Sequence, residues 1–237
     1  MKRFGVLVAT LLAAFGVVHF IAAADAKPSV IPFEQAKLIV EVNGTAGDAG
    51  LQFSLDSDEP WKTIQISNPA GQKIVDIKAK SNLRDFGLTE LFSESNEPPF
   101  DEQPLAAFLD RFPAGQYPFA GETIDGQRLT GTATLTHDIP NGPVVTSPPE
   151  IGTVSPDDAV VRWTPAAQPA GVDVVGYQVI VERQDPLRVF SVDLPATATS
   201  VTIAPEYLEA GTDYTVEVLA IDAGGNQTIT ESSFATA

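Results

Sequence analysis

The chain has 237 residues, a formal net charge of −17 and no cysteine. So acidic a surface repels phosphate backbones and anionic lipid headgroups, so nucleic acid is not an expected partner, and no membrane contact is expected beyond export. The lack of cysteine excludes disulfides, thiolate metal sites and cysteine nucleophiles, and the core must be stabilised by packing.

The first 26 residues have the three parts of a secretory signal peptide. Lys2 and Arg3 precede an apolar run over residues 4–24, and residues 24–26 (Ala-Asp-Ala) have the small-x-small form of a cleavage site. An uncleaved membrane anchor is the alternative, because the run approaches the length that spans a bilayer. His19 inside the run favours cleavage. We therefore predict a secreted or periplasmic protein, with room for two domains of about 100 residues after cleavage.

Alternating apolar and polar residues predict a β-rich N-terminal domain over residues 33–140. A helix is expected after Pro104, because the apolar residues that follow form one stripe at helical spacing: Leu105, Phe108, Leu109 and Phe112. We therefore expect a β-sandwich with one short inserted helix. Strands are expected at residues 35–43, 51–55, 61–67, 73–80, 88–93, 116–121 and 128–137.

Two acidic stretches of this domain are expected to be loops. One carries Asp56, Asp58 and Glu59, and the other spans residues 94–102. Because calcium prefers carboxylate and carbonyl oxygens from loops, the first three residues are a candidate calcium site. An EF-hand is excluded, since Trp61 stands where that loop needs a glycine. Solvated loop charge is the alternative interpretation, and no other cofactor is expected.

Prolines mark the boundary between this domain and a second one over residues 143–237. They occur in residues 140–143 (Pro-Asn-Gly-Pro) and as the pair Pro148-Pro149. Proline-rich joints are stiff, so the two domains are expected to sit end to end with limited swing.

The stretch from Leu208 to Asn226 has the most specific pattern in the chain. Every second residue from Tyr214 to Ala220 is apolar, as in a half-buried strand. Gly211 permits a tight corner before it, and a tyrosine there can bury its ring while its hydroxyl bonds to the backbone upstream. The pattern L-x-x-G-T-x-Y-x-V-x-V-x-A resembles the tyrosine corner and following strand of a fibronectin type III domain; its residues are Leu208, Gly211, Thr212, Tyr214, Val216, Val218 and Ala220.

This resemblance implies a seven-stranded sandwich for the C-terminal domain. Trp163 stands where the family has its core tryptophan, and Tyr177 opens the next strand. With Leu208, Gly211 and Tyr214, these are expected structural residues. The N-terminal half loosely resembles the region upstream of such domains in uncharacterised exported bacterial proteins, which implies no function. The expected fold is all-β, with two β-sandwich domains in tandem, the C-terminal one immunoglobulin-like.

Few residues could support catalysis. The one histidine beyond the signal peptide is His137, and no metalloprotease, serine-hydrolase or nucleotide-binding motif is present. We therefore expect no enzyme and no catalytic residues. The competing hypothesis is an enzyme, or a calcium-stabilised accessory subunit, that acts on an extracellular polymer.

Binding without chemistry is the leading hypothesis, because such scaffolds usually present loops or an edge strand to a partner. The turn Asp222–Asn226 and the second acidic stretch are candidate surfaces. Trp61 or Tyr117 could stack on a sugar, although aromatic residues on alternating strands usually pack in the core. Asn43 and Asn226 each begin an N-glycosylation acceptor sequence. We predict an adhesion or envelope-organising protein whose partner is a protein or a glycan at the cell surface or in the envelope.

Overall fold

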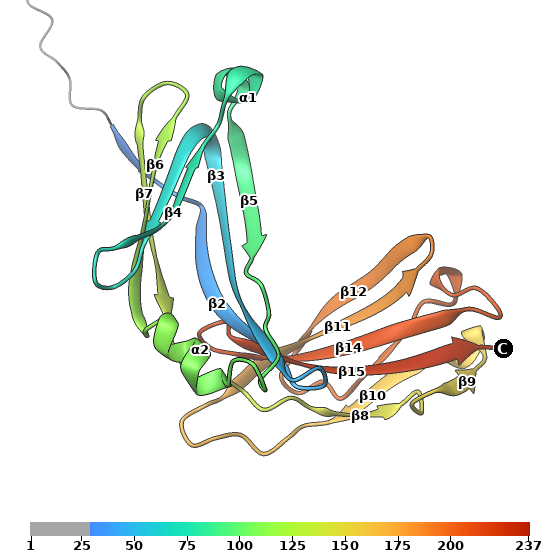
Figure 1. The fold of residues 1–237 in the computed structure, drawn as a ribbon. Helices are drawn as coiled ribbons and strands as arrows, with labels where there is room; N and C mark the ends of the chain where they lie inside the picture. The colour runs from blue at the N-terminus through green and yellow to red at the C-terminus, as the bar shows by residue number, and fades with distance from the viewer. Residues whose placement is uncertain (1–28) are drawn as a thin grey trace, which may run out of the picture.

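The computed structural model describes residues 29–237, so the predicted signal peptide lies outside the described residues. Figure 1 shows two β-rich domains that meet at an angle, and each has its own cluster of buried apolar residues. The fold is all-β with two sandwich domains, as the sequence predicts. In the described part of the chain, no helix is long and apolar enough to cross a membrane.

The long strand β3 (Asp48–Ser67) organises the N-terminal domain because it belongs to both of its layers. Its first half pairs with β2 and β5, and its second half pairs with β4 and β6. Between the two layers lie Trp61, Tyr117 and Phe119, which are at most 1% exposed. The other elements are β1 (Val30–Pro32), β2 (Gln35–Asn43), β4 (Lys73–Lys78), α1 (Ser81–Phe86), β5 (Leu88–Glu94), α2 (Leu105–Arg111), β6 (Gly115–Thr123) and β7 (Arg128–Leu135).

The expected helix is α2, and it buries Phe108 against the core. The structure adds a second helix that the sequence pattern does not predict. None of the residues of α1 is buried, so it carries no apolar stripe that a periodicity analysis could detect.

The C-terminal domain packs a three-stranded sheet, in the order β13-β10-β8, on a sheet that contains β15, β14, β11 and β12. Trp163 and Tyr177 contact each other in its core, with ring centroids 5.3 Å apart. The strands are β8 (Val144–Ser147), β9 (Gly152–Val154), β10 (Val160–Thr164), β11 (Val174–Gln184), β12 (Leu187–Pro195), β13 (Ser200–Thr202), β14 (Asp213–Asp222) and β15 (Gln227–Thr236). Two 3-10 turns lie at Pro156–Asp158 and Pro205–Tyr207.

The acidic stretch around Asp58 is not a loop, contrary to the expectation from sequence. Asp56 pairs with β2 on one side and with β5 on the other, and the register then shifts before Trp61. Ser57 is buried and donates its hydroxyl to the carbonyl of Glu59 at 2.8 Å, which satisfies its polar group within the strand. These acidic residues therefore lie in a strand that continues through a bulge, where its hydrogen-bonding partners change. Their charge resembles that of a loop, which is why the sequence pattern predicts one.

Candidate binding site at the domain junction

The two domains are joined by a pair of strands. The start of β15 runs parallel to the end of β2, with Gln227 opposite Glu41 and Ile229 opposite Asn43. The main-chain amide of Gly44 also donates to the carbonyl of Ile229 at 2.9 Å. The sheets of the two domains therefore continue into each other at this point (Figure 1).

Asn226, immediately before β15, links three segments of this junction. Its side-chain oxygen accepts a hydrogen bond from the amide of Val40 at 2.9 Å. Its side-chain nitrogen donates to the hydroxyl of Thr136 at 2.8 Å and to the carbonyl of Asp138 at 3.3 Å. Only 1% of Asn226 is exposed. The turn Asp222–Asn226 is thus part of the junction rather than a free binding surface, and a glycan could not be attached at Asn226 in this fold.

Three buried aliphatic residues lie near the joined strands but belong to neither core cluster: Ile39, Leu219 and Ile229. Each is on the outward face of its strand, since the alternate positions point into a core. Their burial indicates a small apolar contact at the junction, which adds to the strand pairing.

A cleft of about 300 Å³ opens in the angle between the domains. In Figure 1 this angle lies between β5 and β2 on one side and β12 and β11 on the other. Both domains line the cleft, so its shape depends on the junction. Its residues are Lys37, Ile39, Gln52, Phe53, Ser54 and Phe92 from the N-terminal domain, and Gln178, Asp193, Ile221 and Gln227 from the C-terminal domain.

Each of the three glutamines of the cleft donates a hydrogen bond to a carboxylate. Gln52 donates to Glu94 at 2.8 Å and Gln178 to Asp193 at 2.9 Å. Gln227 donates to Glu41, across the domain junction. These bonds orient the amide groups and leave their carbonyl oxygens available to a ligand.

A group of carboxylates adjoins the cleft. One oxygen each from Glu41, Glu94 and Glu97 lies within 4.8 Å of the others. The side chain of Glu97 packs closely against the backbone of residue 50 because that residue is a glycine. A Cβ on Gly50 would lie 2.9 Å from Oε1 of Glu97. Because calcium binds oxygen ligands, this group is the set of described residues best placed to hold a cation.

Burial and the repulsion of neighbouring carboxylates raise the pKa values of Glu41 and Glu97. Burial raises the pKa of Glu41 from 4.5 to about 7; Glu94 and Glu97 add repulsion, while the hydrogen bond from Gln227 opposes the shift. Burial and the neighbouring Glu94 also raise the pKa of Glu97. A bound cation would favour the charged forms.

The candidate calcium residues Asp56, Asp58 and Glu59 lie elsewhere. They are on β3, and Asp58 and Glu59 are exposed. The structure does not bring their carboxylates together, whereas two members of the second acidic stretch, Glu94 and Glu97, do meet Glu41.

The expected structural residues lie in or beside the C-terminal core. Trp163, Tyr177, Leu208 and Tyr214 are all less than 9% exposed. The hydroxyl of Tyr214 accepts a hydrogen bond from the amide of Glu209 at 2.8 Å. Gly211 has a φ of 67°, in the left-handed region that glycine adopts most readily.

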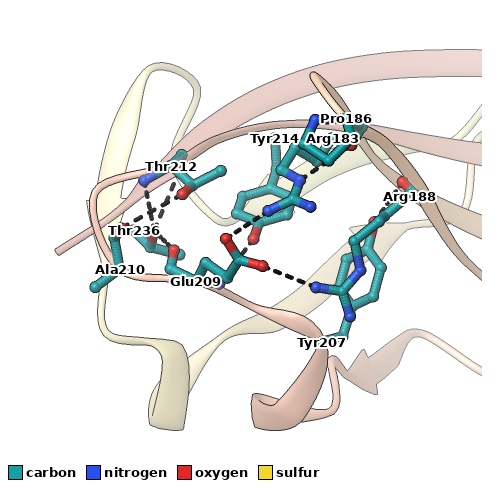
Figure 2. A network of polar contacts seen from close by, with 9 residues as sticks. All are labelled: Arg183, Pro186, Arg188, Tyr207, Glu209, Ala210, Thr212, Tyr214 and Thr236. Carbon is teal, nitrogen blue, oxygen red and sulfur yellow. Dashed lines mark hydrogen bonds and ion pairs between the residues drawn. The ribbon is translucent and has the colours of Figure 1, made fainter.

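Figure 2 shows that this corner is part of a larger polar network. The corner contacts Thr236 at the end of β15, whereas the junction lies at the start of that strand. The carboxylate of Glu209 accepts from the guanidinium of Arg183 at 2.5 Å and from that of Arg188 at 2.9 Å. Arg188 also lies over the ring of Tyr207, 5.4 Å from its centroid. The network ties the β11–β12 hairpin to the corner, and its internal pairing indicates a structural role.

Sequence reasoning missed Phe92, the exposed one of the two aromatic residues that line the cleft. The two aromatic residues considered as sugar platforms, Trp61 and Tyr117, are fully buried. Phe92 is instead 64% exposed on β5. Its neighbour Leu91 packs against the core, so strand alternation alone could have indicated that Phe92 points outward.

His137 does not join a catalytic arrangement. It is exposed, and its Nε2 lies 2.8 Å from the carbonyl of Phe112, to which it donates.

Comparisons with known proteins find a family in the C-terminal half and solved structures that match most of the chain. The family model of the fibronectin type III domain matches residues 147–236. Among solved structures, a segment of two fibronectin type III domains from chicken tenascin is 14% identical, with 86% of this chain and 99% of that chain covered and a TM-score of 0.32. The FN1-FN3 domains of chicken CNTN1 are also 14% identical, with 89% and 66% covered and a TM-score of 0.33. No curated protein matches the chain.

Proposed function

We propose, from a C-terminal half that is a fibronectin type III domain, that this chain is an exported, non-catalytic binding protein that holds its partner in the cleft between its two domains. The partner is a protein or a glycan of the cell surface or envelope. The role is adhesion or organisation of the envelope.

The cleft is the observation that carries this proposal. Ligand sites occur preferentially where domains meet, and both domains contribute side chains to this one. The strand pairing between β2 and β15 holds the two walls together, so a partner need not order them on binding. Fibronectin type III domains commonly serve in binding and adhesion, which agrees with this reading.

Export is supported by the N-terminal sequence pattern. A basic start, an apolar run and a small-x-small site stand in the order that secretion requires. Because the chain has no cysteine, its two cores can fold in an oxidising compartment as well as in a reducing one. This composition is therefore compatible with export.

A binding assay with two matched phenylalanine variants tests the proposal. Labelled protein is applied to the cell-envelope fraction of the producing cells, and wild type is compared with Phe92→Ala in the cleft and Phe86→Ala on α1. Both rings are exposed, by 64% and 80%, so both variants remove a surface aromatic group. We expect Phe92→Ala to lose binding and Phe86→Ala to keep it. Equal binding by the two variants would place the binding surface elsewhere.

A calcium-stabilised form of this module is the second candidate. The observation that favours it is the meeting of Glu41, Glu94 and Glu97 beside the cleft. A cation held by these residues would relieve the repulsion at the junction and thereby stabilise both cleft walls. Thermal melting with and without calcium tests this candidate.

A further inference from the structure

The cleft presents groups that donate and accept hydrogen bonds together, rather than groups of one charge. Gln52, Gln178 and Gln227 each donate an amide hydrogen to a carboxylate, Gln52 also bonds Glu41, and each keeps a carbonyl oxygen for other partners. A sugar hydroxyl both donates and accepts, so it can bond to an amide and to the neighbouring carboxylate at once.

Phe92 adds an apolar plane beside these amides. On β5 it stands opposite Ser54, and 64% of it is exposed. The axial C–H groups of a pyranose ring form an apolar face that packs flat on such a ring, whose π-face is negative.

The depression continues past Phe92. A second hollow of about 270 Å³ shares Ser54 and Phe92 with the cleft and extends along β3 and β5 toward Asp56 and Glu90. Phe92 therefore lies between two adjoining hollows. These two adjoining hollows suit a ligand made of several linked units better than a small compact ligand.

The charges of the site disfavour an anionic polymer. Lys37 and Asp193 are the charged side chains among those that line the cleft, and they balance. Glu41 and Glu94 face the same glutamines, so the surroundings are acidic. Phosphate, sulfate or uronate groups would meet repulsion without a group of cations to hold them.

The site also differs from the usual site for an extended peptide. A peptide in strand form pairs its backbone with the free edge of a sheet. The cleft is lined by residues of β2, β3, β5, β11, β12, β14 and β15, and the edge strands β5 and β12 contribute only Phe92 and Asp193. A ligand that lies in the cleft meets amides, a carboxylate and an aromatic ring instead of main-chain donors and acceptors.

From these contacts we infer that the cleft binds an uncharged polysaccharide, with one sugar ring stacked on Phe92 and its hydroxyl groups bonded to Gln52, Gln178 and Gln227. This inference deepens the proposed function and rests on it. The second hollow accommodates a neighbouring sugar of the same chain.

The test uses the secreted chain and a panel of tetrasaccharides and hexasaccharides. Neutral glucans, mannans, xylans, galactans and N-acetylglucosamine oligomers are compared with oligogalacturonate as the charged probe, with binding followed by NMR titration and calorimetry. We expect at least one neutral series to bind and the charged probe not to bind. Phe92→Ala should weaken the interaction about tenfold or more, and Phe92→Trp should retain it. Phe86→Ala, the matched control on α1, should bind as wild type does.

Three results would overturn the inference: no neutral series binds at millimolar concentration, Phe92→Ala binds as well as wild type, or the charged probe binds as tightly as the neutral ones. Treatment of the envelope fraction separates this failure from that of the proposed function. If binding that depends on Phe92 survives periodate and is lost on proteolysis, the partner is a protein, and the proposed function stands without the polysaccharide. If envelope binding does not depend on Phe92, both fall.

Discussion

Asn226 accepts a hydrogen bond at 2.9 Å from the main-chain amide of Val40, a residue 186 positions earlier in the chain. This contact joins the residue immediately before β15 in one domain to β2 of the other, beside the paired strands. The angle between the domains, and with it the cleft, is therefore determined by specific hydrogen bonds as well as by the stiffness of a proline-rich linker.

Removal of this side chain should weaken the junction. In Asn226→Ala the buried amide of Val40 loses its acceptor, and an unsatisfied buried donor costs about 1–3 kcal/mol. We expect a loss of this size in denaturant unfolding, together with faster proteolysis of residues 136–143. Asn96→Ala, at an exposed loop position, is the control and should change stability by less than about 0.5 kcal/mol. Equal stability of the two variants would mean that the domains are held together in another way.

Stability should fall as the pH rises from about 4.5 to about 7. The pKa of Glu41 and that of Glu217 are each raised from 4.5 to about 7, mainly by burial, so the folded chain binds these protons more tightly than the unfolded chain does. The stabilisation is complete below pH 4.5 and is lost as the pH rises through 7. Around Glu41, the charged neighbours are Glu94 and Glu97, and both increase the effect.

Glu41→Gln isolates the contribution of this residue. The amide stays neutral and can still bond to Gln227, so the variant should be more stable than wild type at pH 7.5 by about 1–3 kcal/mol and no more stable at pH 4. Urea titrations at the two pH values measure the difference. The same stability difference at both pH values would show that the carboxyl of Glu41 does not titrate in this range.

Calcium should raise the melting temperature at pH 7.5 through the carboxylates beside the cleft. We expect a shift with millimolar calcium that a chelator reverses and that the double variant Glu94→Gln/Glu97→Gln abolishes. Asp58→Ala, at the position that the sequence alone selects, should keep the shift, since that exposed residue lies outside the group. Loss of the shift in Asp58→Ala would favour the site on β3, and no shift in wild type would exclude calcium.

The tyrosine corner should matter for stability and not for binding. In Tyr214→Phe the amide of Glu209 loses its acceptor, at an expected cost of about 1–2 kcal/mol in denaturant unfolding. Glu206→Gln, an exposed neighbour, is the control and should be neutral. Because the corner lies far from the junction, envelope binding should be unchanged below the melting temperature. A binding defect in Tyr214→Phe would point to the far end of the domain instead.

Local patterns predict much of the fold. The alternation of residues 35–43 predicts β2 with its observed bounds, and the apolar stripe after Pro104 predicts α2. The spacing from Leu208 to Ala220 predicts the strand after the tyrosine corner. These patterns are informative because each element buries one face in its own domain. The spacing of its apolar residues therefore follows the period of the helix or strand.

The junction could not be predicted in this way. The pairing of β15 with β2 joins segments 186 residues apart, and no local period records which strand lies beside another. Asn226 resembled an exposed turn residue because its partners are main-chain groups and a threonine from distant segments. For the same reason the sequence does not indicate that Glu41 lies beside Glu94 and Glu97. It indicates only that the stretch with Glu94 and Glu97 is acidic.

The most direct test of a permanent shared cleft is a distance measurement across it. The natural chain has no cysteine, so Thr89→Cys on β5 and Ser191→Cys on β12 can carry two spin labels without further changes. Pulsed electron spin resonance should give one narrow distance distribution in the labelled chain with no other change. The distribution should broaden when Asn226→Ala is added. A broad or two-peaked distribution in the otherwise unaltered chain would show that the domains swing freely and would contradict a cleft that both of them build.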